Sequence, residues 1–133
     1  IKQWYNRDIK SMRPFNSEVL LTSDLSQLVE ADIYIIAVSD DAITQLSEQL
    51  PFEDRLVVHT SGSVSPYDID KKNRRGIFYP LQTFSKDAEI NFAEVPLCLE
   101  TLMRKDYQQL KHLGQSISKH TKRVNSDQRA ALH

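Results

Sequence analysis

Runs of apolar residues alternate along the chain with segments whose apolar residues recur at helical spacing. The clearest run covers residues 32–38 (Asp-Ile-Tyr-Ile-Ile-Ala-Val). It is too continuous in its apolar character to have one face in water, which is typical of a strand buried within a parallel sheet. Shorter runs predict further strands at residues 1–5, 19–21, 55–60, 76–79, 95–100 and 121–124.

Helix signals lie between these strands. Residues 39–41 (Ser-Asp-Asp) offer capping side chains and helix-dipole partners for a helix that ends before Pro51. Residues 22–24 cap a short helix through Leu28 in the same way. The apolar face of the helix before Pro51 comprises Ala42, Ile43, Leu46 and Leu50, and that of a longer, later helix comprises Tyr107, Leu110, Leu113 and Ile117.

Strands that alternate with helices at this spacing predict an open α/β sheet, and we interpret it as a Rossmann-type, doubly wound and mostly parallel sheet. In such sheets ligands bind beyond the carboxyl ends of the strands, so the residues that follow each strand are the candidates for ligand binding. Those residues are Asn6 and Arg7, Ser39 to Asp41, Thr60 to Ser63, and Gln82 to Ser85.

Composition narrows the class of protein. The chain has 133 residues, of which 40% are hydrophobic and 26% charged, with a net charge of -1. Such a charge argues against a nucleic-acid partner, because a phosphate-binding surface normally carries a basic excess. No apolar run approaches the roughly 20 residues that cross a bilayer, and no charged and apolar leader stands at the start, so we expect no membrane partner and a cytoplasmic location.

Metal and thiol chemistry are not expected. The single Cys98 stands in the apolar run 95–99, where a buried, unreactive thiol is typical, and one cysteine excludes a disulfide or cysteine-based metal site within the chain. His112 and His120 are too isolated to form a metal site and are expected to be solvated.

The first expected strand ends at Asn6 and Arg7, where the adenosine ribose of a bound dinucleotide would lie. A guanidinium there suits the 2'-phosphate of NADP through charge-assisted bonds, whereas an acidic residue would suit the 2'-hydroxyl of NAD. Two alternatives stay open: Arg7 can be a solvated loop residue, and Asp8 can act as the ribose acid and reverse the preference.

The later strand ends supply the other candidates. Near residues 39–41 we expect backbone contacts from Val38 and Ser39 rather than from the two carboxylates, which are more easily explained as caps. His59 can serve as a general acid or base, because imidazole titrates near neutrality, or it can be a hydrogen-bonded core histidine. No nucleophile-elbow pattern surrounds Ser61, so a serine nucleophile is not expected.

Polar side chains also follow the strand at 76–79. Gln82 and Thr83 come directly after Pro80, which restricts the backbone, and can bind a polar substrate. The alternative is that they are ordinary polar turn residues.

Five segments together resemble a known family: Tyr-Asn-Arg at 5–7, Ala-Val-Ser-Asp-Asp-Ala-Ile at 37–43, Val-His-Thr-Ser-Gly-Ser at 58–63, Phe-Tyr-Pro-Leu-Gln-Thr-Phe-Ser at 78–85 and Asp-Gln-Arg-Ala-Ala-Leu-His at 127–133. The chain resembles bacterial NADP oxidoreductases in which a Rossmann-like domain precedes a C-terminal helical domain of the DUF2520 type. More distantly it is similar to the superfamily of 6-phosphogluconate dehydrogenase, pyrroline-5-carboxylate reductase, prephenate dehydrogenase and the F420-dependent NADP reductases.

The resemblance implies a role for each matching residue. Asn6 and Arg7 would contact the adenosine phosphate, and Val38 and Ser39 would lie beside the dinucleotide. The nicotinamide would be faced by Thr60, Ser61, Gly62 and Ser63, and Ser63 would also contact the substrate. His133 would open the helical domain near the cleft as a second candidate acid or base.

The resemblance also sets the expected organisation. Residues 1–125 would form the NADP-binding domain and residues 126–133 the start of the helical domain, whose remainder would form a homodimer. The family's first strand and glycine-rich loop would precede Ile1, and without that central strand the sheet would have two exposed edges. The expected function is hydride transfer between NADP(H) and a small polar substrate. The alternative is a nucleotide-binding sensor or scaffold without turnover.

Overall fold

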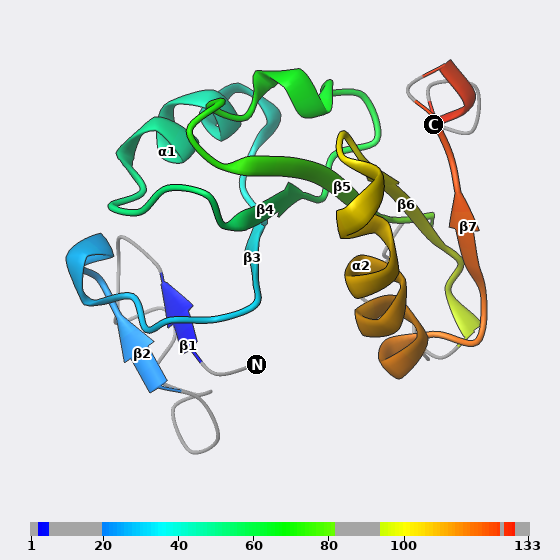
Figure 1. The fold of residues 1–133 in the computed structure, drawn as a ribbon, viewed down its shortest axis with the longest axis horizontal. Coiled ribbons are helices and arrows are strands. Elements are labelled where there is room, and N and C mark those ends of the chain that lie inside the picture. Colours follow the sequence, from blue (N-terminus) through cyan, green and yellow to red (C-terminus); the bar gives the residue numbers. More distant parts are fainter. Residues whose placement is uncertain (1–2, 6–19, 82–93, 126, 130–133) are drawn as a thin grey trace, which may run out of the picture.

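The computed structural model describes residues 3–5, 20–81, 94–125 and 127–129 (Figure 1). Its strands are β1 (Gln3–Tyr5), β2 (Leu20–Thr22), β3 (Ile33–Ile36), β4 (Leu56–His59), β5 (Arg74–Pro80), β6 (Leu97–Thr101) and β7 (Thr121–Arg123). Its helices are α1 (Ile43–Gln49) and α2 (Arg104–Ile117), with short 3-10 turns η2 (Leu25–Gln27), η3 (Asp40–Ala42) and η4 (Pro66–Asp68).

A mixed, mostly parallel sheet forms the body of the fold. Its strand order is β3-β4-β5-β6-β7, in which β6 is antiparallel to β5 and the other neighbouring pairs are parallel. The sheet and its flanking helices confirm the expected Rossmann-like α/β class. Because β3, β4 and β5 run in the same direction, the loops that follow them meet at one edge of the sheet.

Apolar clusters pack on the two faces of this sheet, and β4 contributes to both. Leu56 and Val58 belong to the cluster that contains Leu110 of α2, whereas Val57 belongs to the cluster that contains Ile43 of α1. Successive side chains of a strand point to opposite faces, so the alternation along β4 builds both clusters. All of β4 is buried, which makes it the strand around which the core is organised.

The expectation that residues 32–38 are buried on both faces is wrong. The strand covers only Ile33–Ile36, and Ile35 is 45% exposed. Within the described residues β3 pairs with β4 alone, so it is an edge strand. On the face that carries Ile33 and Ile35, Ile33 packs against the core whereas Ile35 is exposed. The composition of β3 predicts burial on both faces, but the strand that is buried on both faces is its neighbour β4.

The strands β1 and β2 form a separate parallel pair, drawn in blue in Figure 1. Gln3 connects this pair to the following loop: its side-chain oxygen accepts a hydrogen bond from the backbone N–H of Val29 at 2.6 Å, and its amide donates to the carbonyl of Gln27 at 3.1 Å. The helix expected after residues 22–24 is only the turn η2, in which the side chain of Asp24 accepts a hydrogen bond from the backbone N–H of Ser26.

Helix α2 lies against β6 (Figure 1), and its packing follows the predicted stripe for most of its length. Leu110 is buried, and Tyr107 and Leu113 pack beside it. Ile117 does not continue the stripe, because it is 37% exposed in the last turn. The described residues contain no helix that is both long and apolar enough to span a membrane.

Candidate functional site

Two of the predicted ligand-binding loops are joined by a direct side-chain contact. The hydroxyl of Ser63, in the loop after β4, donates a hydrogen bond to Oδ2 of Asp40, in the loop after β3, over 3.0 Å. Both side chains are exposed at the carboxyl edge of the parallel strands. The two loops are therefore linked at this edge by a hydrogen bond between their side chains.

The loop after β3 leads into η3 and then α1. Ser39 occupies the N-cap position of η3 and Ala42 that of α1, and neither position has a side-chain capping bond, so the expectation that side chains of residues 39–41 cap the helix is wrong. Asp40 and Asp41 lie in the first turn, and the Oδ2 of Asp40 is bonded to Ser63. Val38 is 40% exposed and Ser39 is also exposed, so both residues are accessible along the edge.

The loop after β4 is held by its own side chains, and we call residues 60–64 the Ser61 turn. The hydroxyl oxygen of Ser61 accepts hydrogen bonds from the backbone N–H groups of Ser63 and Val64, each at 3.1 Å. Ser61 and Gly62 are buried, Thr60 is half-buried and Ser63 is exposed. The Ser61 side chain therefore shapes the turn from within, and Ser63 presents its hydroxyl outward.

His59 anchors the start of this turn. It is fully buried, its Nδ1 accepts a hydrogen bond from the backbone N–H of Ser61 at 3.0 Å, and its Nε2 lies 3.3 Å from the carbonyl oxygen of Ser65. This arrangement needs a neutral ring with its proton on Nε2. Burial is the main cause that lowers the pKa of His59 below its ordinary value of 6.5. The geometry matches the core-histidine alternative, and a role in acid or base chemistry stays a prediction.

An ion pair between the buried Arg129 and the half-buried Glu100 supports the same turn. Arg129 is 1% exposed, and its Nη1 donates to Oε2 of Glu100, at the end of β6, at 3.1 Å. Its Nε donates to the carbonyl of Gly62 at 3.0 Å and its Nη2 to that of Val64 at 2.6 Å. Burial raises the pKa of the Glu100 carboxyl, and the neighbouring guanidinium opposes that rise.

The sequence interpretation assigned no role to Arg129 or Glu100. One signal was available: Glu100 is a charged residue directly after the apolar run 95–99, and a charge so close to a buried strand requires a partner. The identity of the partner could not be read from the sequence, because Arg129 is 29 residues away along the chain.

The remaining predicted site residues lie outside the described part of the chain. These are Asn6, Arg7, Gln82, Thr83 and His133. Their assignments stay predictions. Within the described residues, no group of three or more histidine, cysteine, aspartate or glutamate side chains could hold a metal ion.

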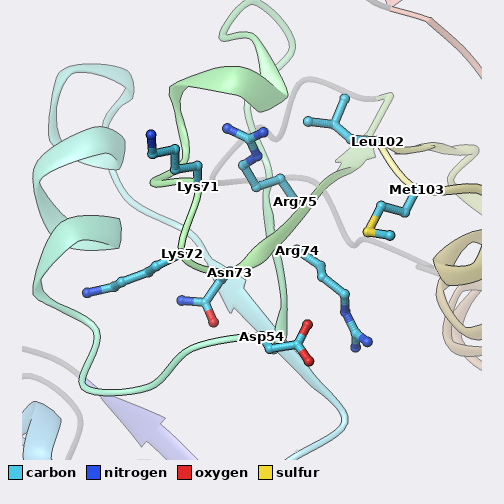
Figure 2. Close-up of a pocket in the computed structure, with 8 residues that line it drawn as sticks. All are labelled: Asp54, Lys71, Lys72, Asn73, Arg74, Arg75, Leu102 and Met103. Atoms are coloured by element: carbon cyan, nitrogen blue, oxygen red, sulfur yellow. The ribbon is translucent and has the colours of Figure 1, made fainter.

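A pocket of about 260 Å³ lies at the opposite, amino end of β5 (Figure 2). Four basic residues line it, but their side chains diverge in Figure 2, and three of them have local partners. Lys72 donates to the carbonyl of Glu48, Arg74 pairs with Asp106 of α2, and the guanidinium of Arg75 lies over the ring of Tyr67. The pocket is therefore not the site that the strand ends define.

Known structures share this fold. The chain is 33% identical to BF3122 of Bacteroides fragilis, named as a putative NADP oxidoreductase, with a TM-score of 0.86 over 100% of this chain and 54% of that one. TM1727 of Thermotoga maritima is 20% identical, with a TM-score of 0.76 over 100% of this chain and 53% of that one. An imine reductase from Myxococcus stipitatus, solved with NADP+, is 18% identical, with a TM-score of 0.65 over 96% of this chain and 48% of that one.

These likenesses define the class of protein as Rossmann-like, with NADP oxidoreductase-like proteins among its structural neighbours. The chain spans about half the length of each of these three solved structures. No model of a known protein family matches it, and no curated protein matches it by sequence.

Proposed function

We propose that the protein containing this chain is an NADP-dependent oxidoreductase that transfers hydride between NADP(H) and a small polar substrate such as a carbonyl, an imine or an alcohol. The observation that carries the proposal is the bond between Ser63 and Asp40, because it unites the loops after β3 and β4 at the edge where Rossmann folds bind dinucleotides. The likeness to BF3122, at 33% identity, supports the same class of function.

The described residues of this edge are compatible with a dinucleotide. Val38 and Ser39 are exposed and would lie along the cofactor, with Thr60, Ser61 and Gly62 toward the nicotinamide. The Ser61 side chain is used within the turn, so its contribution there would come from the backbone. The cofactor supplies the hydride chemistry, and the chain supplies binding and orientation.

Ser63 would contact the substrate or the nicotinamide amide. Its hydroxyl proton is directed to Asp40, and its oxygen lies 3.4 Å from the Ser61 hydroxyl, so one lone pair is left to accept a hydrogen bond from a ligand N–H or O–H. Gln82 and Thr83 would complete the polar substrate contacts. His133 and His59 are the candidate acids or bases, and a homodimer formed beyond this domain is part of the same proposal.

Asn6 and Arg7 would bind the adenosine 2'-phosphate, which makes cofactor preference the direct test. NADPH and NADH are titrated by fluorescence against the longest chain that the gene encodes, for the wild type and Arg7→Ala. Loss of one charge-assisted hydrogen bond costs about 1.5–3 kcal/mol, so the NADPH dissociation constant should rise roughly tenfold to over a hundredfold. NADH binding should change little, because NADH carries no 2'-phosphate.

Arg104→Ala is the matched control for charge. Arg104 is exposed in the first turn of α2, which follows the end of β6. Since the end of β6 pairs with the amino half of β5, Arg104 lies away from the carboxyl edge. Equal NADPH affinities of Arg7→Ala and Arg104→Ala would refute the 2'-phosphate assignment. A wild-type protein that binds neither nucleotide would refute the oxidoreductase proposal and leave a sensor or scaffold for a different ligand.

A further inference from the structure

The side chain of Arg129 connects three parts of the fold that are distant in sequence. It comes from residues 127–129, after β7, and contacts the carbonyls of Gly62 and Val64 and the carboxylate of Glu100. The contacts to the Ser61 turn join residues that are 65 and 67 positions apart. A guanidinium presents its donors in a rigid planar fork, so one side chain can fix several acceptors at once.

Local structure sets the position of Arg129. The backbone N–H of Val124 donates to the carbonyl of Leu99, which extends the pairing of β7 with β6. Asn125 and Gln128 then exchange side-chain to backbone hydrogen bonds at 2.9 and 2.8 Å, in a reciprocal capping arrangement. The N–H of Arg129 donates to the carbonyl of Asn125 at 3.0 Å. Contacts within this segment therefore fix the backbone from which the Arg129 side chain extends to the turn.

The burial of Arg129 needs an explanation beyond general stability. An ion pair with a buried member contributes little net stability, because the desolvation cost offsets the attraction between the charges. Here two of the three acceptors are carbonyls of the Ser61 turn, and Ser63 lies between them in sequence. Fixing Gly62 and Val64 fixes the backbone of Ser63, whose hydroxyl contacts Asp40 across the candidate site.

We propose that Arg129 is a positioning residue of the candidate site: it holds the Ser61 turn in the conformation that receives the cofactor, and it ties that turn to the segment after β7. The part of this role that concerns the cofactor rests on the proposed function. Arg129 acts through the backbone of the turn, and the placement of residues 127–129 thereby sets the placement of Ser63 relative to Asp40.

The test uses the longest encoded chain and two substitutions. Arg129→Lys keeps the charge beside Glu100 and loses the planar fork. The double variant Arg129→Met/Glu100→Gln removes both charges, so no carboxylate is left unpaired if the single variant folds poorly. Arg123→Lys and Arg123→Met are the controls, because Arg123 is an exposed arginine of β7 that lies over the ring of Tyr107, 4.5 Å from its centroid.

Hydrogen exchange followed by mass spectrometry separates a local role from a global one. The N–H groups of Ser61, Ser63 and Val64 are hydrogen-bonded within the turn and to His59, so a peptide spanning residues 60–65 reports its opening. We expect exchange there to accelerate about tenfold or more in both Arg129 variants, while peptides from β4 and β5 keep the wild-type rate. The Arg123 controls should match the wild type throughout.

NADPH affinity is measured on the same proteins. A turn that has lost its support should bind the cofactor about fivefold to tenfold more weakly, because part of the binding free energy is spent on ordering it. Unchanged exchange in residues 60–65, or faster exchange with an NADPH dissociation constant within twofold of the wild type, would overturn the positioning role. If the wild type binds no NADPH, the proposed function fails, and the exchange rates alone decide whether Arg129 holds the turn.

Discussion

The buried His59 offers a prediction whose size follows from its surroundings. His59→Ala removes the acceptor for the N–H of Ser61 and the partner of the Ser65 carbonyl, at the end of a fully buried strand. Each hydrogen bond contributes about 0.5–1.5 kcal/mol net, and a buried N–H left without an acceptor costs about 1–3 kcal/mol. We therefore expect the free energy of unfolding to fall by about 2–4 kcal/mol, measured by urea denaturation.

A conservative substitution tests the hydrogen bond made by Nδ1 of His59. The side-chain oxygen of His59→Asn can replace Nδ1 as the acceptor for Ser61, so this variant should recover at least about 1 kcal/mol of the loss in His59→Ala. His112→Ala is the control, because His112 is exposed on α2 and its removal should change stability by no more than about 0.5 kcal/mol. A His59→Ala protein as stable as the control would refute the structural account of this residue.

The pH dependence of stability tests the same account. The folded state lowers the pKa of His59, chiefly through burial, so below pH 6.5 the unfolded chain binds a proton that the folded chain does not. The contribution of neutral His59 to the free energy of unfolding is thus fully present above pH 6.5, and it is lost as the pH falls toward the lowered pKa of the folded state. Below pH 6.5 the free energy of unfolding should rise more steeply with pH in the wild type than in His59→Asn. The difference in slope should be at most about 1.4 kcal/mol per pH unit, which is the limit for one proton. Identical slopes in both proteins would contradict the neutral, buried ring.

Two further predictions concern the sheet. Gly76→Ala should lower the free energy of unfolding by about 1–3 kcal/mol in urea denaturation, which is the usual cost of overpacking. The reason is that an added Cβ would lie 2.6 Å from the backbone oxygen of Glu100 on the neighbouring strand. A variant as stable as the wild type would show that β5 and β6 can separate there. Cys98 is fully buried and burial raises the pKa of its thiol, so a thiol reagent such as Ellman's should modify it only as fast as the sheet opens. Rapid modification under native conditions would contradict that burial.

The sequence alone determined where the strands lie and where ligand-binding loops should follow them. The apolar runs at 55–60, 76–79 and 95–100 correspond to β4, β5 and β6, because short apolar, β-branched runs predict buried strands from local composition. The Rossmann-like class followed from their alternation with helices. Once the strands are parallel, the convergence of residues 39–41 and 60–63 at one edge is a consequence of topology, and the bond between Ser63 and Asp40 confirms that these two loops meet.

Only the tertiary structure decided the properties that depend on distant neighbours. The exposure of Ile35 in β3 reflects which segments pack over that face of the sheet, and the apolar composition of the strand holds no information about that. The hydrogen bonds of His59 and the partners of Arg129 depend on how the chain returns to the same point, in the latter case across 29 to 67 residues. Local patterns arise from a period of two or 3.6 residues, whereas the pairing of buried polar groups is set by the whole packed fold.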